Sequence, residues 1–121
     1  MDKKCVIAID LDGTLAYWDE HLEDNNQYWK IGEPIMPMIN LAKEHIKNGD
    51  KVIVFTARIS NDNLSYMEMA RLKKEIIDWC YYYIGEYLEV TNIKTRDINL
   101  FYDDKAIHVE KNTGRIIGDK L

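Results

Sequence analysis

The sequence has little of what marks secreted, membrane-spanning or nucleic-acid-coating proteins. Its 121 residues include only two cysteines, far apart and outside any C-x-x-C pair, so we expect no disulfide framework and a reducing compartment. The apolar run at residues 5–9 is too short for a signal peptide, and no apolar run approaches membrane-spanning length. Basic side chains number 16 against 21 acidic ones, a formal charge of −5 that argues against non-specific binding to nucleic acid. These absences predict a soluble cytoplasmic protein without a membrane partner.

Four short apolar runs predict the strands of a parallel sheet. Residues 5–9 and 51–55 are continuous and rich in β-branched side chains, as in strands covered on both faces. Residues 98–102 repeat the pattern more weakly, and residues 87–90 can form a further short strand. Helical patterns separate these runs, so the strands are expected to be linked by crossovers rather than by tight turns.

Two helices are predicted between the strands. An apolar stripe between residues 35 and 46 indicates the first, with Pro37 in its first turn and Gly49 just beyond its end. A longer helix is expected from the cap candidates at 61–63 to Ile84, where a glycine follows.

Together these elements predict an α/β fold, a single Rossmann-like, three-layer domain over residues 1–121 with a mainly parallel sheet. The polar stretch at about residues 15–33 is expected to form a small flap after the first strand. Residues 107–117 are expected to form a C-terminal hairpin, turned around residues 112–114.

The unusual side chains follow the predicted strands. Asp10 and Asp12 end the first strand, Thr56 ends the strand at 51–55, and Asp103 and Asp104 follow the last one. In a parallel sheet these ends share one edge, so four carboxylates are expected to converge there. Crowded carboxylates repel one another unless a cation neutralises them, and Mg²⁺ bound by carboxylates, phosphate and water meets that need. The sequence therefore predicts a metal-assisted phosphate site.

Two known classes of acidic metal site, the EF-hand calcium loop and the response-regulator receiver domain, do not fit this sequence. A calcium loop of the EF-hand type needs glycine at its sixth position and an acid at its twelfth, whereas Gly13 is fourth here and His21 twelfth. A response-regulator receiver domain has this length and an acidic Mg²⁺ pocket, but its phosphoaccepting aspartate ends a middle strand. Here the middle strand ends in Thr56, and the acid pair comes last.

The order that fits is that of the haloacid dehalogenase superfamily of phosphohydrolases, which the chain resembles from about residue 4 to residue 107. Its first motif, D-x-D-G-T after a buried strand, matches residues 10–14, and its second, a threonine or serine closing a core strand, matches Thr56. Its third, a lysine upstream of the last motif, matches Lys94 best, with Lys73, Lys74 and Lys105 as rivals; its fourth, an acid pair, matches residues 103–104.

The resemblance implies a Mg²⁺-dependent phosphomonoester hydrolase that works through an aspartyl-phosphate. Asp10 would be the nucleophile and Asp12 the acid and base, while Thr56 and Lys94 would neutralise the phosphoryl oxygens. The metal would be held by four positions, namely Asp10, Asp12 through its backbone carbonyl, Asp103 and Asp104. Substrate would contact the backbone around Leu11 and Gly13 and the turn at Ala57 and Arg58.

Some assignments stay open at this point. Arg58 either contacts a substrate anion or forms an exposed salt bridge, and the flap aromatics Tyr17, Trp18, Tyr28 and Trp29 either stack on substrate or pack the flap. The resemblance implies a capless member with an open site, whose phosphorylated substrate is a small molecule, a nucleotide or a polynucleotide end. The hairpin is expected either to cover that site or to form the edge of a homo-oligomer. A phosphotransferase of the same mechanism and a non-catalytic phosphate-binding or regulatory module remain alternatives.

Overall fold

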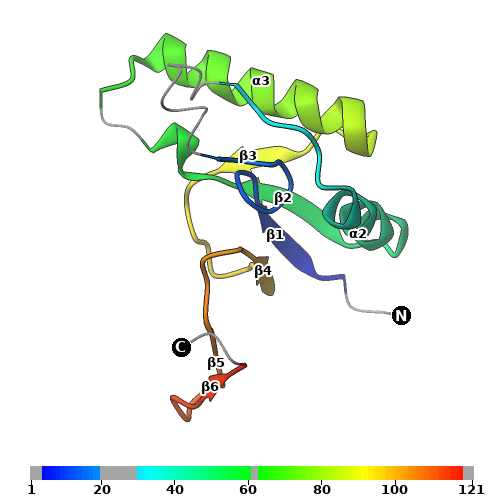
Figure 1. Cartoon of the computed structure of the whole chain (residues 1–121), viewed down its shortest axis with the longest axis vertical. Helices are drawn as coiled ribbons and strands as arrows, with labels where there is room; N and C mark the ends of the chain where they lie inside the picture. The colour runs from blue at the N-terminus through cyan, green and yellow to red at the C-terminus, as the bar shows by residue number, and fades with distance from the viewer. Residues whose placement is uncertain (1–3, 20–29, 61–62, 119–121) are drawn as a thin grey trace.

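Strands and helices alternate along the chain, as the sequence predicts (Figure 1). The structure, a computed structural model, describes residues 4–19, 30–60 and 63–118. The flap aromatics Tyr28 and Trp29 lie outside these residues. None of the described helices is both long and apolar enough to cross a bilayer.

Four parallel strands form the main sheet. Strand β1 (Val6–Asp10) lies between β2 (Lys51–Phe55) and β4 (Leu100–Tyr102), and β3 (Glu89–Thr91) pairs with the far side of β2. All the predicted strands are present, and β2 has the predicted bounds. The α/β class, the parallel sheet and the single Rossmann-like arrangement are therefore confirmed.

Helix α2 (Met36–Lys47) follows the flap. Ile35 precedes it without a side-chain cap, and Pro37 stands in its first turn, where the missing N–H removes a donor that would have no helical partner. The helix ends just before Gly49, whose φ of +92° reverses the chain toward β2. Both predicted end signals of this helix are confirmed.

Helix α3 (Tyr66–Ile84) starts later than the sequence pattern predicted. Its N-cap is Ser65, whose hydroxyl accepts from the Glu68 N–H at 3.1 Å, while the Glu68 carboxylate accepts from the Ser65 N–H at 3.3 Å. This capping box satisfies two end donors reciprocally. Of the predicted cap candidates, Asn61 and Asp62 lie outside the described residues, and Asn63 lies two residues before the observed cap. None of the three is followed three residues later by a glutamate or glutamine, as Ser65 is. The predicted end, at Gly85 with φ +94°, is confirmed.

Both helices cover the same face of the sheet. Alternate strand residues such as Ile7, Ile9 and Val54 share one buried cluster with residues of α2 and α3. The connections from β1 to β2 and from β2 to β3 step in the same direction across the sheet, and the right-handed rule for parallel crossovers then puts both helices on one side. The remaining crossover, residues 92–99, is fully described and forms no helix. The crossover that would supply the third layer expected from the sequence is therefore a loop without a helix.

The C-terminal segment is a separate two-stranded hairpin, as predicted. Strands β5 (His108–Val109) and β6 (Ile116–Ile117) pair antiparallel around a turn in which Asn112 and Gly114 have positive φ. Figure 1 shows this hairpin projecting from the end of β4, away from the sheet and the helices.

The flap leaves and rejoins the body at adjacent points. Ala16 forms a bridge with Pro34, and the N–H groups of Tyr17 and Ile35 donate to Glu33 O and Leu15 O, each at 2.8 Å. The two described ends of the flap are thereby fixed side by side, next to the carboxyl end of β1.

Candidate active site

Three carboxylates meet where β1 and β4 end. Asp10 is the last residue of β1, and Asp103 and Asp104 directly follow β4, its neighbour in the sheet. One carboxylate oxygen from each residue lies within 4.8 Å of the other two. The convergence that parallel strand ends predict is present for these three side chains.

The crowding changes the chemistry of Asp10. Burial, a hydrogen bond with Asp104 and the negative charges of Asp103, Asp104 and Asp12, in that order, raise the pKa of Asp10 to about 7. Each of these effects disfavours the charged carboxylate. A positive charge placed beside Asp10 would favour its ionised form.

The loop after β1 holds Asp104 in place. The buried Thr14 donates its hydroxyl proton to Asp104 Oδ1 at 3.1 Å and accepts from the Asp104 N–H, also at 3.1 Å. Gly13 has φ +89°, and a Cβ there would lie 2.7 Å from Asp104 Oδ2. Glycine is thus required both by the backbone angle and by the close approach of the carboxylate. Thr14 is a positioning residue that the sequence analysis did not single out, although the D-x-D-G-T motif contains it.

Asp12 points away from the three carboxylates toward Arg58. The guanidinium donates from Nε to Oδ2 at 2.7 Å and from Nη2 to Oδ1 at 2.9 Å, so it engages both oxygens. The side chains are only 11% exposed for Arg58 and 25% for Asp12. Nη2 also donates to Lys30 O at 2.7 Å, which links the flap to the site. Of the two roles left open for Arg58, the structure shows the salt bridge, inside the pocket rather than on the open surface.

A short turn orients Arg58 toward Asp12. It lies in the 3₁₀ helix η1 (Ala57–Ile59), and its N–H donates at 3.1 Å to the Oγ1 of Thr56, the buried cap of that turn. The Thr56 N–H in turn donates to Thr91 O at the end of β3. Thr56 therefore fixes the direction in which the chain leaves β2 and presents Arg58 to Asp12.

These residues line a cavity of about 480 Å³. Its lining combines carboxylates with aromatic and basic side chains. The lining consists of Asp10, Asp12, Gly13, Trp18, Phe55, Thr56, Ala57, Arg58, Asp103, Asp104 and Lys105.

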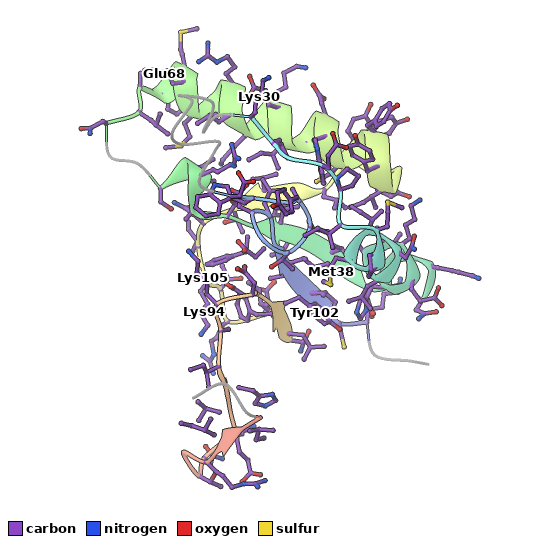
Figure 2. The ribbon with its side chains drawn as sticks, in the orientation of Figure 1. Lys30, Met38, Glu68, Lys94, Tyr102 and Lys105 are labelled. Atoms are coloured by element: carbon purple, nitrogen blue, oxygen red, sulfur yellow. The ribbon has the colours of Figure 1, made fainter. Side chains whose placement is uncertain are left out.

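Three predicted site residues are placed differently by the structure. Leu11 is not among the residues that line the cavity, and its side chain is fully buried in the core; the contact predicted for its backbone stays a prediction. The Gly13 N–H donates to Ala16 O at 2.8 Å, so the predicted phosphate cradle does not include this donor. Lys94 lies with its Nζ 5.3 Å from the centre of the Phe101 ring, outside the cavity wall, whereas its rival Lys105 forms part of that wall. Figure 2 labels both lysines near the start of the hairpin.

A polar chain supports β4 from the helix side. The Tyr102 hydroxyl lies 3.1 Å from His45 Nε2, and His45 Nδ1 lies 2.7 Å from Asp50 Oδ2. Asp50 also accepts from the Cys5 N–H at 3.1 Å. Hydrogen bonding to His45 and to this N–H holds the pKa of Asp50 below its usual range. The chain fixes Tyr102, the residue before Asp103, against α2 and the start of β1.

A second, smaller cavity of about 330 Å³ lies on the α2 side of the acidic cluster. Met38 and Tyr102, labelled in Figure 2, contribute its apolar wall, and it shares Gly13, Asp103 and Asp104 with the first cavity. The two carboxylates are thus reachable from both sides of the strand end.

Sequence and structure comparisons give the fold but no family. No family model matches the chain, and no curated protein matches it. A solved structure of a conserved protein from Bacteroides thetaiotaomicron is similar, with a TM-score of 0.58 and 23% sequence identity over 86% of this chain and 78% of the other. At this identity the likeness supports the shared α/β architecture alone.

Proposed function

We propose that the chain is a Mg²⁺-dependent phosphomonoester hydrolase of the haloacid dehalogenase type, working in the cytoplasm through an aspartyl-phosphate at Asp10. The observation that carries this proposal is the meeting of the Asp10, Asp103 and Asp104 carboxylates within 4.8 Å at the carboxyl ends of two neighbouring parallel strands. Three carboxylates without a neutralising partner are costly together, and a hard dication with oxygen ligands removes that cost.

The donor set suits Mg²⁺. Asp10, Asp103 and Asp104 would hold the ion, with the Asp12 backbone carbonyl as the further ligand expected from the D-x-D motif. When bound, the ion would neutralise the carboxylates and the phosphoryl oxygens of the substrate. The Asp10 pKa of about 7 without an ion fits a site arranged around a positive charge.

The first chemical step belongs to Asp10. A carboxylate oxygen attacks phosphorus, forming an acyl-phosphate bond while the bond from phosphorus to the ester oxygen breaks. The leaving alkoxide takes a proton from Asp12. In the second step a water attacks phosphorus and gives a proton to Asp12, and the acyl-phosphate bond breaks to release inorganic phosphate and restore Asp10.

For Asp12 to transfer a proton, Arg58 has to release at least one of the two Asp12 oxygens. Both Asp12 oxygens accept from Arg58, so neither can carry a proton until a contact is released. A substrate phosphate offers the guanidinium an equivalent two-pronged partner. We therefore assign Arg58 to phosphate binding in the loaded site, with Asp12 freed as the phosphate arrives, while Thr56 and Lys105 contact the remaining phosphoryl oxygens.

The same ion pair favours a second candidate, a phosphate-binding module without turnover. If Arg58 stays on Asp12 when phosphate binds, the site has a nucleophile but no proton donor. The two candidates differ in one measurable property, the release of inorganic phosphate.

The deciding experiment is a phosphate-release screen of the purified chain with Mg²⁺ against nucleotides, sugar phosphates, an aryl phosphate, and oligonucleotides with 3′- or 5′-phosphates. We expect turnover of at least one ester. Asp10→Asn should lower that turnover by several orders of magnitude, because a covalent nucleophile is lost. Asp78→Asn, on the exposed face of α3, is the matched control and should retain full activity. Turnover by Asp10→Asn at the wild-type rate would refute the nucleophile.

A further inference from the structure

The hairpin at residues 107–117 projects away from the main sheet and from the helices of the described chain. Ile107, Val109, Ile116 and Ile117 are 42–53% exposed, and Figure 1 shows the hairpin clear of the body. Val109 faces Ile116 across the ladder, and His108 faces Ile117, so both faces of the hairpin carry an exposed apolar side chain. A two-stranded hairpin without packing partners is marginally stable in water, so a covered state is expected.

The edge of the sheet next to the hairpin is also uncovered. In the described residues β4 has β1 as a strand neighbour on one side and none on the other. Leu100 is 48% exposed on the helix side of β4, and Phe101 is 37% exposed on the opposite side. An exposed edge strand with apolar side chains readily takes up another segment of chain.

The amount of this surface matches what a stable dimer needs. At their exposed fractions, these six side chains offer roughly 500 Å² of apolar area, which equals the apolar share, about 60%, of the about 800 Å² that each partner contributes to a standard interface.

Charge indicates that the partner is another copy of the chain. The hairpin, residues 107–117, carries Lys111 and Arg115 against the single acid Glu110, a formal charge of +1, whereas the chain as a whole has a formal charge of −5. The hairpin is thus a positive arm on a negative body, and it is attracted to the body of a second copy. Because it projects away from its own sheet, it reaches a second copy more directly than its own β4.

We propose that the chain forms a two-fold symmetric dimer in which the hairpin of each copy packs against the β4 edge of the other. Such a contact is isologous, so both hairpins and both β4 edges are covered at once. The inference rests on exposed apolar surface and charge, and it holds whether or not the acidic site has catalytic activity.

The test is sedimentation velocity of the full chain over a range of concentrations. We expect twice the 14.3 kDa chain mass for the wild type. Val109→Asp in the hairpin and Leu100→Asp at the β4 edge should each weaken dimerisation at least tenfold. Met67→Asp, which adds the same charge at a side chain 81% exposed on α3, is the control and should leave the dimer intact. Far-UV circular dichroism checks that each variant is folded, and Leu100→Ser replaces Leu100→Asp if the latter is not.

Mixing the Val109→Asp and Leu100→Asp variants distinguishes a dimer in which hairpin contacts β4 edge from one in which hairpin contacts hairpin or edge contacts edge. In a dimer of either variant both contacts carry one substitution. A mixed dimer has one intact contact, between the hairpin of the Leu100→Asp copy and the β4 edge of the Val109→Asp copy, and one contact that carries both substitutions. Because a contact that one substitution already breaks loses little more from a second, the mixture should dimerise more tightly than either variant alone. A wild-type chain that stays monomeric throughout would overturn the proposal. So would a Leu100→Asp dimer as tight as the wild type, because this result means that hairpins pair with each other.

Discussion

Arg58 binds both carboxylate oxygens of Asp12, at 2.7 and 2.9 Å, across 46 residues of sequence. The contact joins the turn after β2 to the turn after β1. Through Lys30 O it also joins the described end of the flap. Arg58 thus binds the Asp12 carboxylate in the structure, and in the proposed reaction it binds the phosphate of the substrate.

Arg58→Ala should destabilise the fold by about 2 kcal/mol, because it leaves the partly buried Asp12 carboxylate without its charged donors. Arg58→Lys should recover only part of this loss, since an ammonium cannot make the two-pronged contact. Urea denaturation of the three proteins measures the difference. Equal stability of wild type and Arg58→Ala would show that the ion pair contributes nothing to the fold.

The free energy of unfolding should fall as pH rises from about 4 to about 7 in metal-free buffer. The native pKa of Asp10, about 7, lies above its ordinary value of 3.8, so the native state holds a proton that the unfolded chain releases within this window. The contribution of this group is fully present below pH 4 and is lost as pH passes 7. Melting temperatures of wild type and Asp10→Asn should therefore diverge across the window, with the variant becoming relatively more stable. Parallel curves would contradict the raised pKa.

Mg²⁺ binding should be measurable apart from any turnover. Calorimetric titration of the wild type with Mg²⁺ should show one site, and Asp103→Asn or Asp104→Asn should weaken it at least tenfold by removing a ligand oxygen. Asp78→Asn, an exposed carboxylate outside the cluster, is the control. Unchanged binding in both cluster variants would place the ion elsewhere.

Lys105 rather than Lys94 should serve as the phosphate-facing lysine. Lys105→Ala should lower kcat/KM about 100-fold for the best substrate found, because a cation beside the developing charge is lost. Lys94→Ala should lower it by less than threefold, since Lys94 lies over Phe101 outside the cavity wall. The reverse ranking would restore the assignment made from the motif order.

Much of this molecule is readable from local sequence. β-Branched runs place β1 and β2, a proline and a glycine mark the ends of α2, and the acids stand at strand ends. These features follow from backbone sterics and from the period of apolar residues, which act over a few positions. Because parallel strands bring their carboxyl ends to one edge, the sequence also predicted that the carboxylates of Asp10, Asp12, Asp103 and Asp104 would converge. Three of them do, whereas Asp12 binds Arg58 instead.

What only the tertiary structure decided is where long side chains point once the strand ends have met. Thr14 and Asp104 are 90 residues apart, and their reciprocal hydrogen bonds exist only because β1 and β4 are neighbours. Arginine and lysine reach several angstroms from their backbone, so their partners are set by the packed surroundings and not by sequence position. For this reason the order of the motifs predicts Lys94, whereas the folded chain lines its cavity with Lys105. For the same reason the pairing of Arg58 with Asp12 follows from the fold and not from the sequence.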